Sequence, residues 1–391
     1  MNKVFGVELS NSKGRYCELD LPATDYELLD ALEKLQMKPG EEPDWEITEH
    51  TYFQYLQTYL DGECDLYQFN ELARRLEKMN IEEQGCFEGL FHVALYERFG
   101  PKSIKDLFTY TENTDKCLLI DARNDEELGR FYVENGFLPE LEQIPESLLE
   151  PILPRLDYAG IGKQFRCSEH GMFARGCYIL QHSELIPSKM FIPPLRTPDY
   201  AFRLEIGRYD FEHDRGPTLV VPLDLPASEE QLLTALEEIE AASLEEVVIK
   251  VEDSAVPGLL ENMESLDIRE VNELAQQIKD RERRLELSKL KAVFAVTAPN
   301  DVHAAIRIAE NLDDYIFATD LRTQEEVARD EIQVSTDEPL QSLLLKHTDL
   351  FAVGRELLNA PYLSMTEYGL IQRRDCSPLL RQEQPNQTQT M

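Results

Sequence analysis

Lysine and arginine are scarce in this sequence. Its 391 residues include 39 basic against 75 acidic side chains, which gives a net charge of −36. Both halves carry the excess, with −17 over residues 1–195 and −19 over residues 196–391, so an acidic tail does not account for it. Such a field repels phosphates and the sequence offers no basic stripe, which excludes direct binding of nucleic acid. We therefore expect partners with basic surfaces, such as the DNA-binding grooves of other proteins. Solubility or salt adaptation is the alternative reason for the charge.

A regular cysteine framework and long apolar runs are also missing. The seven cysteines are odd in number and irregularly spaced, which favours free thiols in a reducing cytosol. The first residues, MNKVFGVELSNSKGR, lack the apolar core of a signal peptide, and no apolar run reaches the roughly 20 residues that span a bilayer. Hydrophobic residues still make up 42% of the chain, which is normal for a folded protein. We expect a soluble cytoplasmic protein with no membrane partner.

Common catalytic motifs are absent as well. The sequence has no nucleophile elbow, no phosphate-binding P-loop, no HExxH zinc motif and no glycine-rich dinucleotide turn. Abundant carboxylates always allow an imagined acid–base pair, but no pair stands out from the rest. We therefore expect a binding protein that is not an enzyme and needs no cofactor.

The most informative feature that is present is an internal repeat. Residues 19–33 read LDLPATDYELLDALE, and residues 223–237 read LDLPASEEQLLTALE. Further segments recur in the same order: Asn70–Ala73 as Asn272–Ala275, Glu126–Glu127 as Glu325–Glu326, Gly162–Lys163 as Gly354–Arg355, and Gly171 as Gly369. This order indicates two diverged copies of one module. We predict copies at residues 1–185 and 201–375, a proline-rich linker at 186–200 and a disordered tail at 376–391.

Each copy has the pattern of an α/β fold of the α+β kind, with small sheets and a helix-rich middle. Short strands are expected at the start of each copy, at 4–8, 16–19, 202–206 and 218–221. Thr24 and Ser228 then have the residue types of helix N-caps. Helices are predicted in the middle of each copy, at 66–79, 83–99, 268–279 and 282–294. Short strands at 117–121 and 315–319 precede an acidic helix, and a closing strand follows a further helix, at 172–180 and 370–373.

The first helix of each copy has one apolar stripe. In the first copy the stripe consists of Leu28, Leu29, Leu32 and Leu35. This spacing leaves Glu27, Asp30 and Glu33 facing outward. In the second copy the predicted buried residues are Leu232, Leu233, Leu236 and Ile239.

Acidic residues recur at helical spacing on the expected outer faces. Carboxylates at positions i and i+4 lie about 6 Å apart along a helix, near the spacing of successive phosphates. Duplex DNA carries one charge per about 1.7 Å, so a net charge of −36 corresponds to roughly 60 Å of duplex. A single row is most simply a solvated helix face, but its occurrence in both copies indicates a surface for a basic partner. The candidate partner-binding residues, which include a predicted loop at 41–46, are Glu27, Asp30, Glu33, Glu41, Glu42, Asp44, Asp125, Glu126, Glu127, Glu140, Glu142, Glu146, Glu237, Glu238, Glu261, Glu264 and Asp267.

One group of residues has the types of a zinc site, namely Cys167, His170, Cys177 and His182. The corresponding stretch of the second copy, Met365–Cys376, has no histidine and one cysteine, although it should fold in the same way. We therefore predict no metal site.

The first copy resembles the ArdA-type antirestriction proteins of conjugative elements and phages. The segments that carry the resemblance are FNELARRLEKMN (69–80), CLLIDARNDEELGRFYVENGFLPE (117–140), and LDYAGIGKQF followed by HGMF (156–173), with LDLPAT (19–24) before them. The resemblance covers most of residues 1–180 and, more weakly, 200–375. It implies an elongated α/β protein whose carboxylates are arrayed like phosphates and which occupies the DNA site of type I restriction–modification enzymes.

Members of that family are single-copy and dimeric, whereas this chain fuses two copies. The fused copies are expected to form a pseudo-dimer within one chain, with a chain dimer as the alternative. The second copy has its own basic run, so it either has lost the mimicry or faces its neighbour; the run consists of Arg281, Arg283, Arg284, Lys289 and Lys291. The resulting expectation is a DNA-mimicking antirestriction protein. The alternatives are mimicry aimed at a CRISPR effector or a nucleoid protein, and an acidic interaction scaffold of a mobile element.

Overall fold

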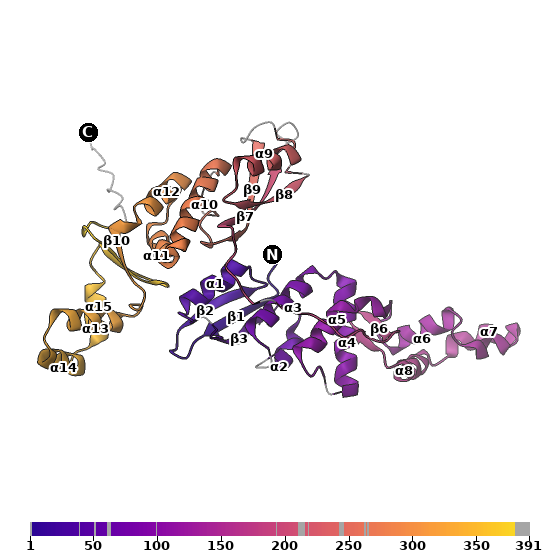
Figure 1. The fold of residues 1–391 in the computed structure, drawn as a ribbon. Helices are drawn as coiled ribbons and strands as arrows, with labels where there is room; N and C mark the ends of the chain where they lie inside the picture. The colour runs from indigo at the N-terminus through magenta and orange to yellow at the C-terminus, as the bar shows by residue number, and fades with distance from the viewer. Residues whose placement is uncertain are drawn as a thin grey trace, which may run out of the picture. The chain divides into compact units, whose positions relative to one another are not determined.

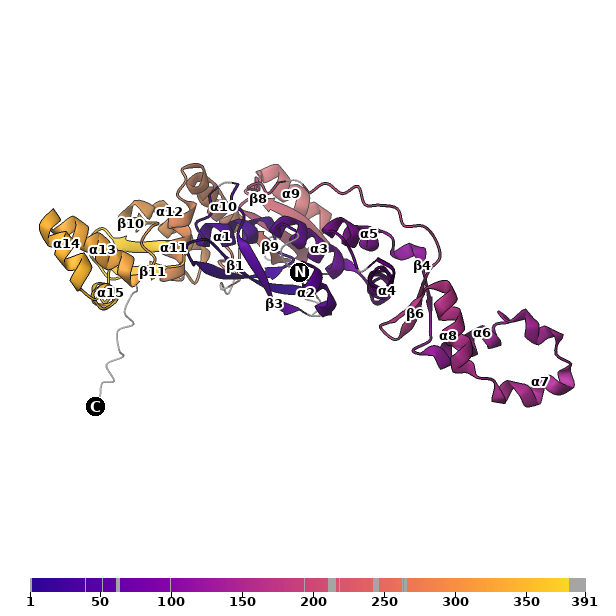
Figure 2. The ribbon, with the colours of Figure 1, turned by 90° about the horizontal axis from the view of Figure 1, so that it is seen from below.

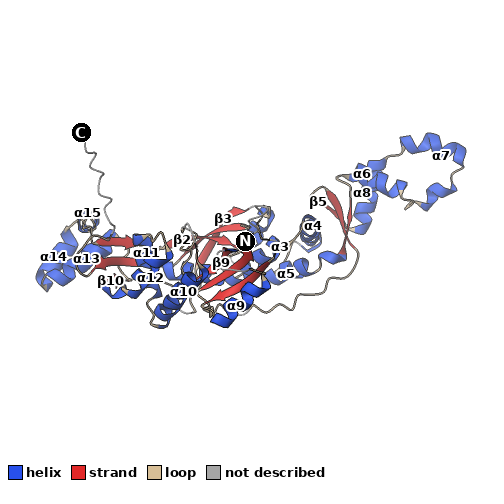
Figure 3. Ribbon diagram, turned by 90° about the horizontal axis from the view of Figure 1, so that it is seen from above, coloured by secondary structure: helices blue, strands red, loops and turns tan. Residues whose placement is uncertain are grey.

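The computed structural model divides the chain into two compact units. Unit 1 comprises Met1–Ala23 and Pro39–Leu195, and unit 2 comprises Thr24–Lys38 and Arg196–Met391. Both contain helices and small antiparallel sheets, so the predicted α+β class is confirmed (Figure 3). None of the described helices combines the length and the apolar character that a bilayer crossing requires. The described residues are 2–38, 40–50, 52–60, 64–98, 100–192, 194–209, 216–217, 219–241, 246–261, 263 and 266–379.

The first sheet of unit 1 has β1 at its centre, in the order β2-β1-β3 (Figure 1). Its strands are β1 (Phe5–Ser10), β2 (Tyr16–Leu21) and β3 (Asp44–His50). The predicted loop at 41–46 is therefore wrong in part, because Asp44 and Glu46 lie on β3. Trp45 and Ile47, which alternate with them, turn inward, and Trp45 stacks on Phe69 at 4.8 Å between ring centroids. The helices that follow are α2 (Gln57–Leu60), α3 (Leu66–Lys78), α4 (Ile81–Arg98) and α5 (Ile104–Glu112).

The rest of unit 1 consists of a second sheet and the helices that its chain crosses on the way. The strands β4 (Cys117–Ile120), β5 (Met172–Ala174) and β6 (Cys177–Gln181) pair in the order β4-β6-β5. Between β4 and β5 the chain forms α6 (Asp125–Glu134), the short turn η3 (Pro139–Gln143), α7 (Glu146–Ile152) and α8 (Tyr158–Glu169). Helices α6 and α8 lie side by side (Figure 2).

Unit 2 repeats this element order (Figure 1). Its sheets have the orders β8-β7-β9 and β10-β12-β11, as in unit 1. The strands are β7 (Phe202–Arg208), β8 (Val220–Leu225), β9 (Val247–Ser254), β10 (Tyr315–Ala318), β11 (Leu363–Thr366) and β12 (Gly369–Arg373). The helices are α9 (Glu229–Glu238), α10 (Ile268–Arg283), α11 (Leu287–Thr297), α12 (Val302–Glu310), α13 (Gln324–Ser335), α14 (Glu338–His347) and α15 (Leu350–Leu357).

Equivalent hydrogen bonds in the two repeats explain why some of the repeated residues are the same in both. The side chain of Asn70 accepts a hydrogen bond of 2.7 Å from the Ala23 N–H, and Asn272 does the same for Ala227. Each asparagine thus holds the backbone just before the first helix of its repeat. The predicted pairing of Gly171 with Gly369 is wrong, because Gly369 opposes Thr366 in its hairpin as Cys177 opposes Ala174.

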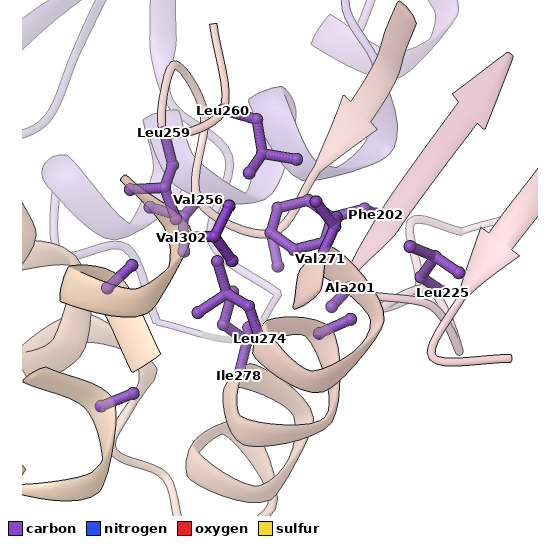
Figure 4. Close-up of a cluster of buried hydrophobic side chains, with 14 of the residues drawn as sticks. Ala201, Phe202, Leu225, Val256, Leu259, Leu260, Val271, Leu274, Ile278 and Val302 are labelled. Atoms are coloured by element: carbon purple, nitrogen blue, oxygen red, sulfur yellow. The ribbon is translucent and has the colours of Figure 1, made fainter. Parts of the chain in front are cut away.

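The core of unit 2 lies between its first sheet and helix α10. Phe202 of β7 meets Val271 and Leu274 of α10, all three fully buried (Figure 4). The predicted stripe of α9 holds for Leu232 but not for Leu233, whose side chain is half exposed.

Helix α1 (Asp25–Lys34) belongs to the first repeat by sequence and to unit 2 by packing. Thr24 caps it as predicted, in a capping box with Glu27. Tyr26 is buried in the core of unit 2, and its hydroxyl donates to the Tyr200 carbonyl. The compact units therefore differ from the predicted division at 185 and 201, because this helix finds its apolar and ionic partners in the second repeat.

The predicted linker carries no helix or strand at its described residues, 186–192 and 194–200. Its start is held by Asn113, whose side chain accepts from the Ile186 N–H at 2.9 Å. In the predicted tail, Leu379 is buried and its N–H donates to the Pro361 carbonyl at 3.0 Å. Residues 380–391 lie outside the described residues.

Glycines at equivalent positions allow the close helix packing in both repeats. A Cβ atom on Gly162 of α8 would lie 1.8 Å from the Asp125 carbonyl oxygen, and one on Gly354 of α15 would lie 1.9 Å from that of Gln324. We expect Gly162→Ala and Gly354→Ala each to destabilise the protein by about 2 kcal/mol or more, because a backbone must move. Thermal unfolding measures this. The matched control is Gly216→Ala, whose added Cβ meets no atom within 4 Å; an equal loss in that variant would contradict the packing argument.

Candidate partner-binding surface

Three glutamates stand side by side on the first sheet of unit 1. Glu8 of β1 is opposite Glu18 of β2 on one side and Glu46 of β3 on the other. All three side chains are exposed, on the face opposite buried Val7 and Leu9. Neighbouring strands are about 4.8 Å apart, so the carboxylates follow one another at roughly that interval. We call these three residues the glutamate row.

Acidic neighbours continue the same face of the sheet. Asp44 is opposite Ser10, one position further along the exposed side. At the other end Asp20 and Glu49 flank Gly6, and Lys3 binds both, at 2.8 and 2.5 Å. These hydrogen bonds raise the pKa of Lys3 and lower the pKa of Glu49. Lys3 therefore balances one end of the face, while within the described residues no lysine or arginine forms an ion pair with the glutamate row.

The glutamate row opposes folding. Like charges directly opposite each other on neighbouring strands destabilise a sheet, and here two such pairs share Glu8. Features that conflict with local stability are concentrated at functional sites. The glutamate row is therefore the strongest candidate for a surface that binds basic side chains of a partner.

The same face of the second repeat is electrically balanced. Register places Pro222, Glu205 and Lys250 at the positions of Glu18, Glu8 and Glu46. Lys250 binds Glu205 at 3.1 Å, and Arg203 binds Asp224 at 2.8 Å. Among the described residues, a row of glutamates without ion pairs on this face is therefore a property of the first repeat.

The predicted acidic row on α6 is partly used within unit 1. Asp125 is half buried and receives two hydrogen bonds from Arg166, at 2.7 and 3.0 Å, which lower the pKa of the carboxyl. Glu126 is exposed and pairs with Arg130 at 2.9 Å. Glu127 is exposed but accepts from the Arg123 N–H at 2.8 Å. Glu140 is exposed on η3, and the side chains of Glu142 and Glu146 lie outside the described residues.

The predicted row on α1 fails at its centre. Asp30 is 5% exposed, so the prediction that it faces outward is wrong. Its Oδ1 lies 2.6 Å from Lys291 Nζ and accepts from the Tyr368 hydroxyl at 2.9 Å. Glu33 is half buried and binds the same lysine at 2.7 Å, and only Glu27 is exposed. Helical periodicity put Asp30 outside the stripe of α1 itself, but unit 2 covers that side.

The other predicted residues are distributed over both units. Glu41 and Glu42 of unit 1 are exposed just before β3. Glu237 and Glu238 are exposed on α9, and Glu261 is exposed before α10. Asp267 is exposed and caps α10, accepting from the Arg269 N–H at 2.8 Å, whereas Glu264 lies outside the described residues.

Part of the basic run of the second repeat lies inside unit 2. Lys291 is buried between Asp30 and Glu33, and Arg281 is buried beside Glu286 at 2.8 Å. These two cations are neutralised internally and leave the charge of the surface unchanged. Arg283 is exposed and pairs with Asp280.

Several exposed carboxylates were missed. Glu8 and Glu18 alternate with apolar neighbours, so the period of a strand could have identified them. Helix α13 of unit 2 corresponds to α6 in the element order. Exposed acidic residues that were also not predicted lie on α13, on α14 and between them, namely Asp330, Glu331, Asp337 and Glu338.

Within the described residues, no three histidine, cysteine, aspartate or glutamate side chains are arranged to hold a metal ion. His182 of the considered zinc group instead contacts the Ser183 hydroxyl, at 2.6 Å. A cavity of about 310 Å³ in unit 2 is lined mostly by apolar residues, together with Lys291, Asn300 and Tyr368.

Removing one charge from the glutamate row should stabilise the protein. We expect Glu8→Gln to raise the Tm by about 1–2 °C in low salt, because two like-charge contacts disappear, and the gain to shrink as salt is added. The equivalent variant of the second repeat, Glu205→Gln, breaks an ion pair and should give no rise. Calorimetry at two ionic strengths measures both, and equal responses of the two variants would show that the row carries no repulsion.

Comparison with known proteins adds no relative. Neither the protein-family models nor the curated proteins contain a match to this chain. The case for the surface therefore rests on its residues and their geometry.

Proposed function

We propose that this protein is a DNA mimic that occupies the DNA-binding groove of a type I restriction–modification enzyme. The observation that carries the proposal is the glutamate row, three adjacent exposed carboxylates without a described basic partner. The mechanism is competitive occupancy of a basic groove, without catalysis or cofactor.

The spacing of the row suits a groove that binds phosphates. Carboxylates on neighbouring strands follow at about 4.8 Å, and alternate residues along a strand at about 6.6–6.8 Å. One DNA strand presents a phosphate per about 3.4 Å of axis, so lysines and arginines placed for phosphates can reach carboxylates at these intervals. Binding would release the counterions of the row, as binding to DNA does.

Exposed carboxylates of the helices extend the acidic character of unit 1. Glu126 on α6 and Glu140 on η3 are exposed, and their segment carries eleven acidic and five basic side chains between residues 121 and 169. The choice of a type I restriction enzyme as target rests on the resemblance of residues 1–180 to ArdA-type proteins.

Neutralising the row should weaken binding to the target. We expect Glu8→Gln/Glu18→Gln/Glu46→Gln to reduce affinity for a type I methyltransferase core at least tenfold in low salt. We also expect the slope of log affinity against log salt to fall by about 2–3. The matched control removes three carboxylates of unit 2 that each pair with a basic side chain, Glu205→Gln/Asp224→Asn/Glu229→Gln, and should bind almost as the wild type does. Binding that is independent of salt, or equal losses in both variants, would contradict the proposal.

A phage challenge identifies the target in cells. The wild-type protein should raise the titre of unmodified phage in a host with a type I system and leave it unchanged in a non-restricting host. The triple variant should leave the titre unchanged in both hosts. Protection only against a CRISPR effector would redirect the proposal to that target.

A further inference from the structure

Helix α1 packs on a surface of unit 2 whose charges match its own. Asp30 binds Lys291 at 2.6 Å, and one turn later Lys34 binds Glu367 at 2.7 Å. Arg322 donates to the carbonyl of Lys34 at the end of the helix. We call Lys291, Arg322, Glu367 and Tyr368 the α1 site.

The contact between Lys291 and Asp30 at the α1 site is buried, whereas Glu367 is exposed. The side chain of Lys291 is 2% exposed and that of Asp30 is 7% exposed. Breaking such a pair by removing one partner leaves an uncompensated charge in the interior, which is strongly destabilising. The site therefore discriminates against a helix that has no carboxylate at the position of Asp30.

The first repeat carries the opposite charges at the equivalent positions. Lys291 follows buried Leu290 on α11, and Glu88 follows buried Phe87 in the same place on α4. The hairpin registers place Arg175 after Ala174 where Glu367 follows Thr366. Glu88 and Arg175 bind each other at 2.9 Å.

The first helix of the second repeat also lacks the matching residues. The shared sequence LDLPA aligns Asp30 with Thr234 and Lys34 with Glu238 on α9. At the α1 site, Thr234 would bring no carboxylate in place of Asp30, so Lys291 would keep only the carboxylate at the position of Glu33, where α9 has Glu237. Glu238 would face Glu367.

We propose that the α1 site selects the helix of the first repeat by charge and that each repeat rejects its own helix. On a first repeat, Asp30 would meet Glu88 and Lys34 would meet Arg175, two like-charge contacts. On a second repeat, α9 would leave the buried Lys291 with one carboxylate in place of two and would bring Glu238 against Glu367. The partner of this surface is thus α1 of this chain, and homotypic pairing of repeats is disfavoured.

Transplanting second-repeat residues into α1 tests the proposal in the full chain. Asp30→Thr/Lys34→Glu should speed amide exchange of residues 25–35 at least tenfold and lower the Tm by about 5–10 °C. The control Glu27→Gln is a transplant of the same kind, from position 231, at an exposed residue; Gln231 forms the same capping box, so exchange should not change.

Compensating substitutions in the α1 site complete the test. Adding Lys291→Met and Glu367→Lys to the double variant removes the buried cation that has lost its Asp30 partner and restores an ion pair with position 34. We expect protection of residues 25–35 to return to near the wild-type level, even if the double variant alone does not fold. Unchanged exchange in the double variant, or no recovery in the compensated chain, would overturn the proposal.

Discussion

Repulsion among carboxylates is the constraint under which this chain folds. It has nearly two acidic side chains for every basic one, so the positions of its cations decide where repulsion is relieved. In unit 2, Lys279, Arg281 and Lys291 are all buried, each beside carboxylates. Cations held inside stabilise the fold but add nothing to the surface field. Their carboxylate partners are largely buried with them, so the excess of carboxylates in the composition remains on the exterior.

The two repeats share one framework and use it differently. Their sheets have the same order and the same pairing, yet one sheet face carries the glutamate row and the other is balanced by Lys250 and Arg203. Helix α1 belongs to the first repeat by sequence, but its buried Asp30 is paired with Lys291 of the second repeat. Divergence after duplication has thus separated a surface with unrelieved charge from one that supplies internal contacts.

Much of the framework could be predicted from the sequence, because it depends on local signals. Thr24 and Ser228 at N-caps, and the apolar period of α3 and α10, determine elements without knowledge of their neighbours. Strand β3 was not predicted, because four acidic residues between positions 41 and 46 suggest a loop and only Trp45 and Ile47 mark its inward face. Asp30 was misplaced because its burial depends on Lys291, 261 residues away.

The acidic character of the candidate surface could be predicted from the sequence, but its position on the first sheet could not. The excess of carboxylates was evident, whereas the glutamate row depends on strand register, which brings Glu8 beside both Glu18 and Glu46. Helical spacing suggested rows on α1 and α6, where tertiary ion pairs then engaged Asp30 and Asp125. Strand register and tertiary ion pairs, neither of which a local pattern shows, decide which acidic residues have basic partners.

Competition with DNA tests the central claim most directly. The full-length protein and a short duplex are titrated together against a type I methyltransferase core, and the occupancy of the enzyme by each is measured. If the carboxylates stand in for phosphates, the two ligands exclude each other, and the apparent inhibition constant rises in proportion to the DNA concentration. A ternary complex of enzyme, DNA and protein, with affinities independent of each other, would contradict the account.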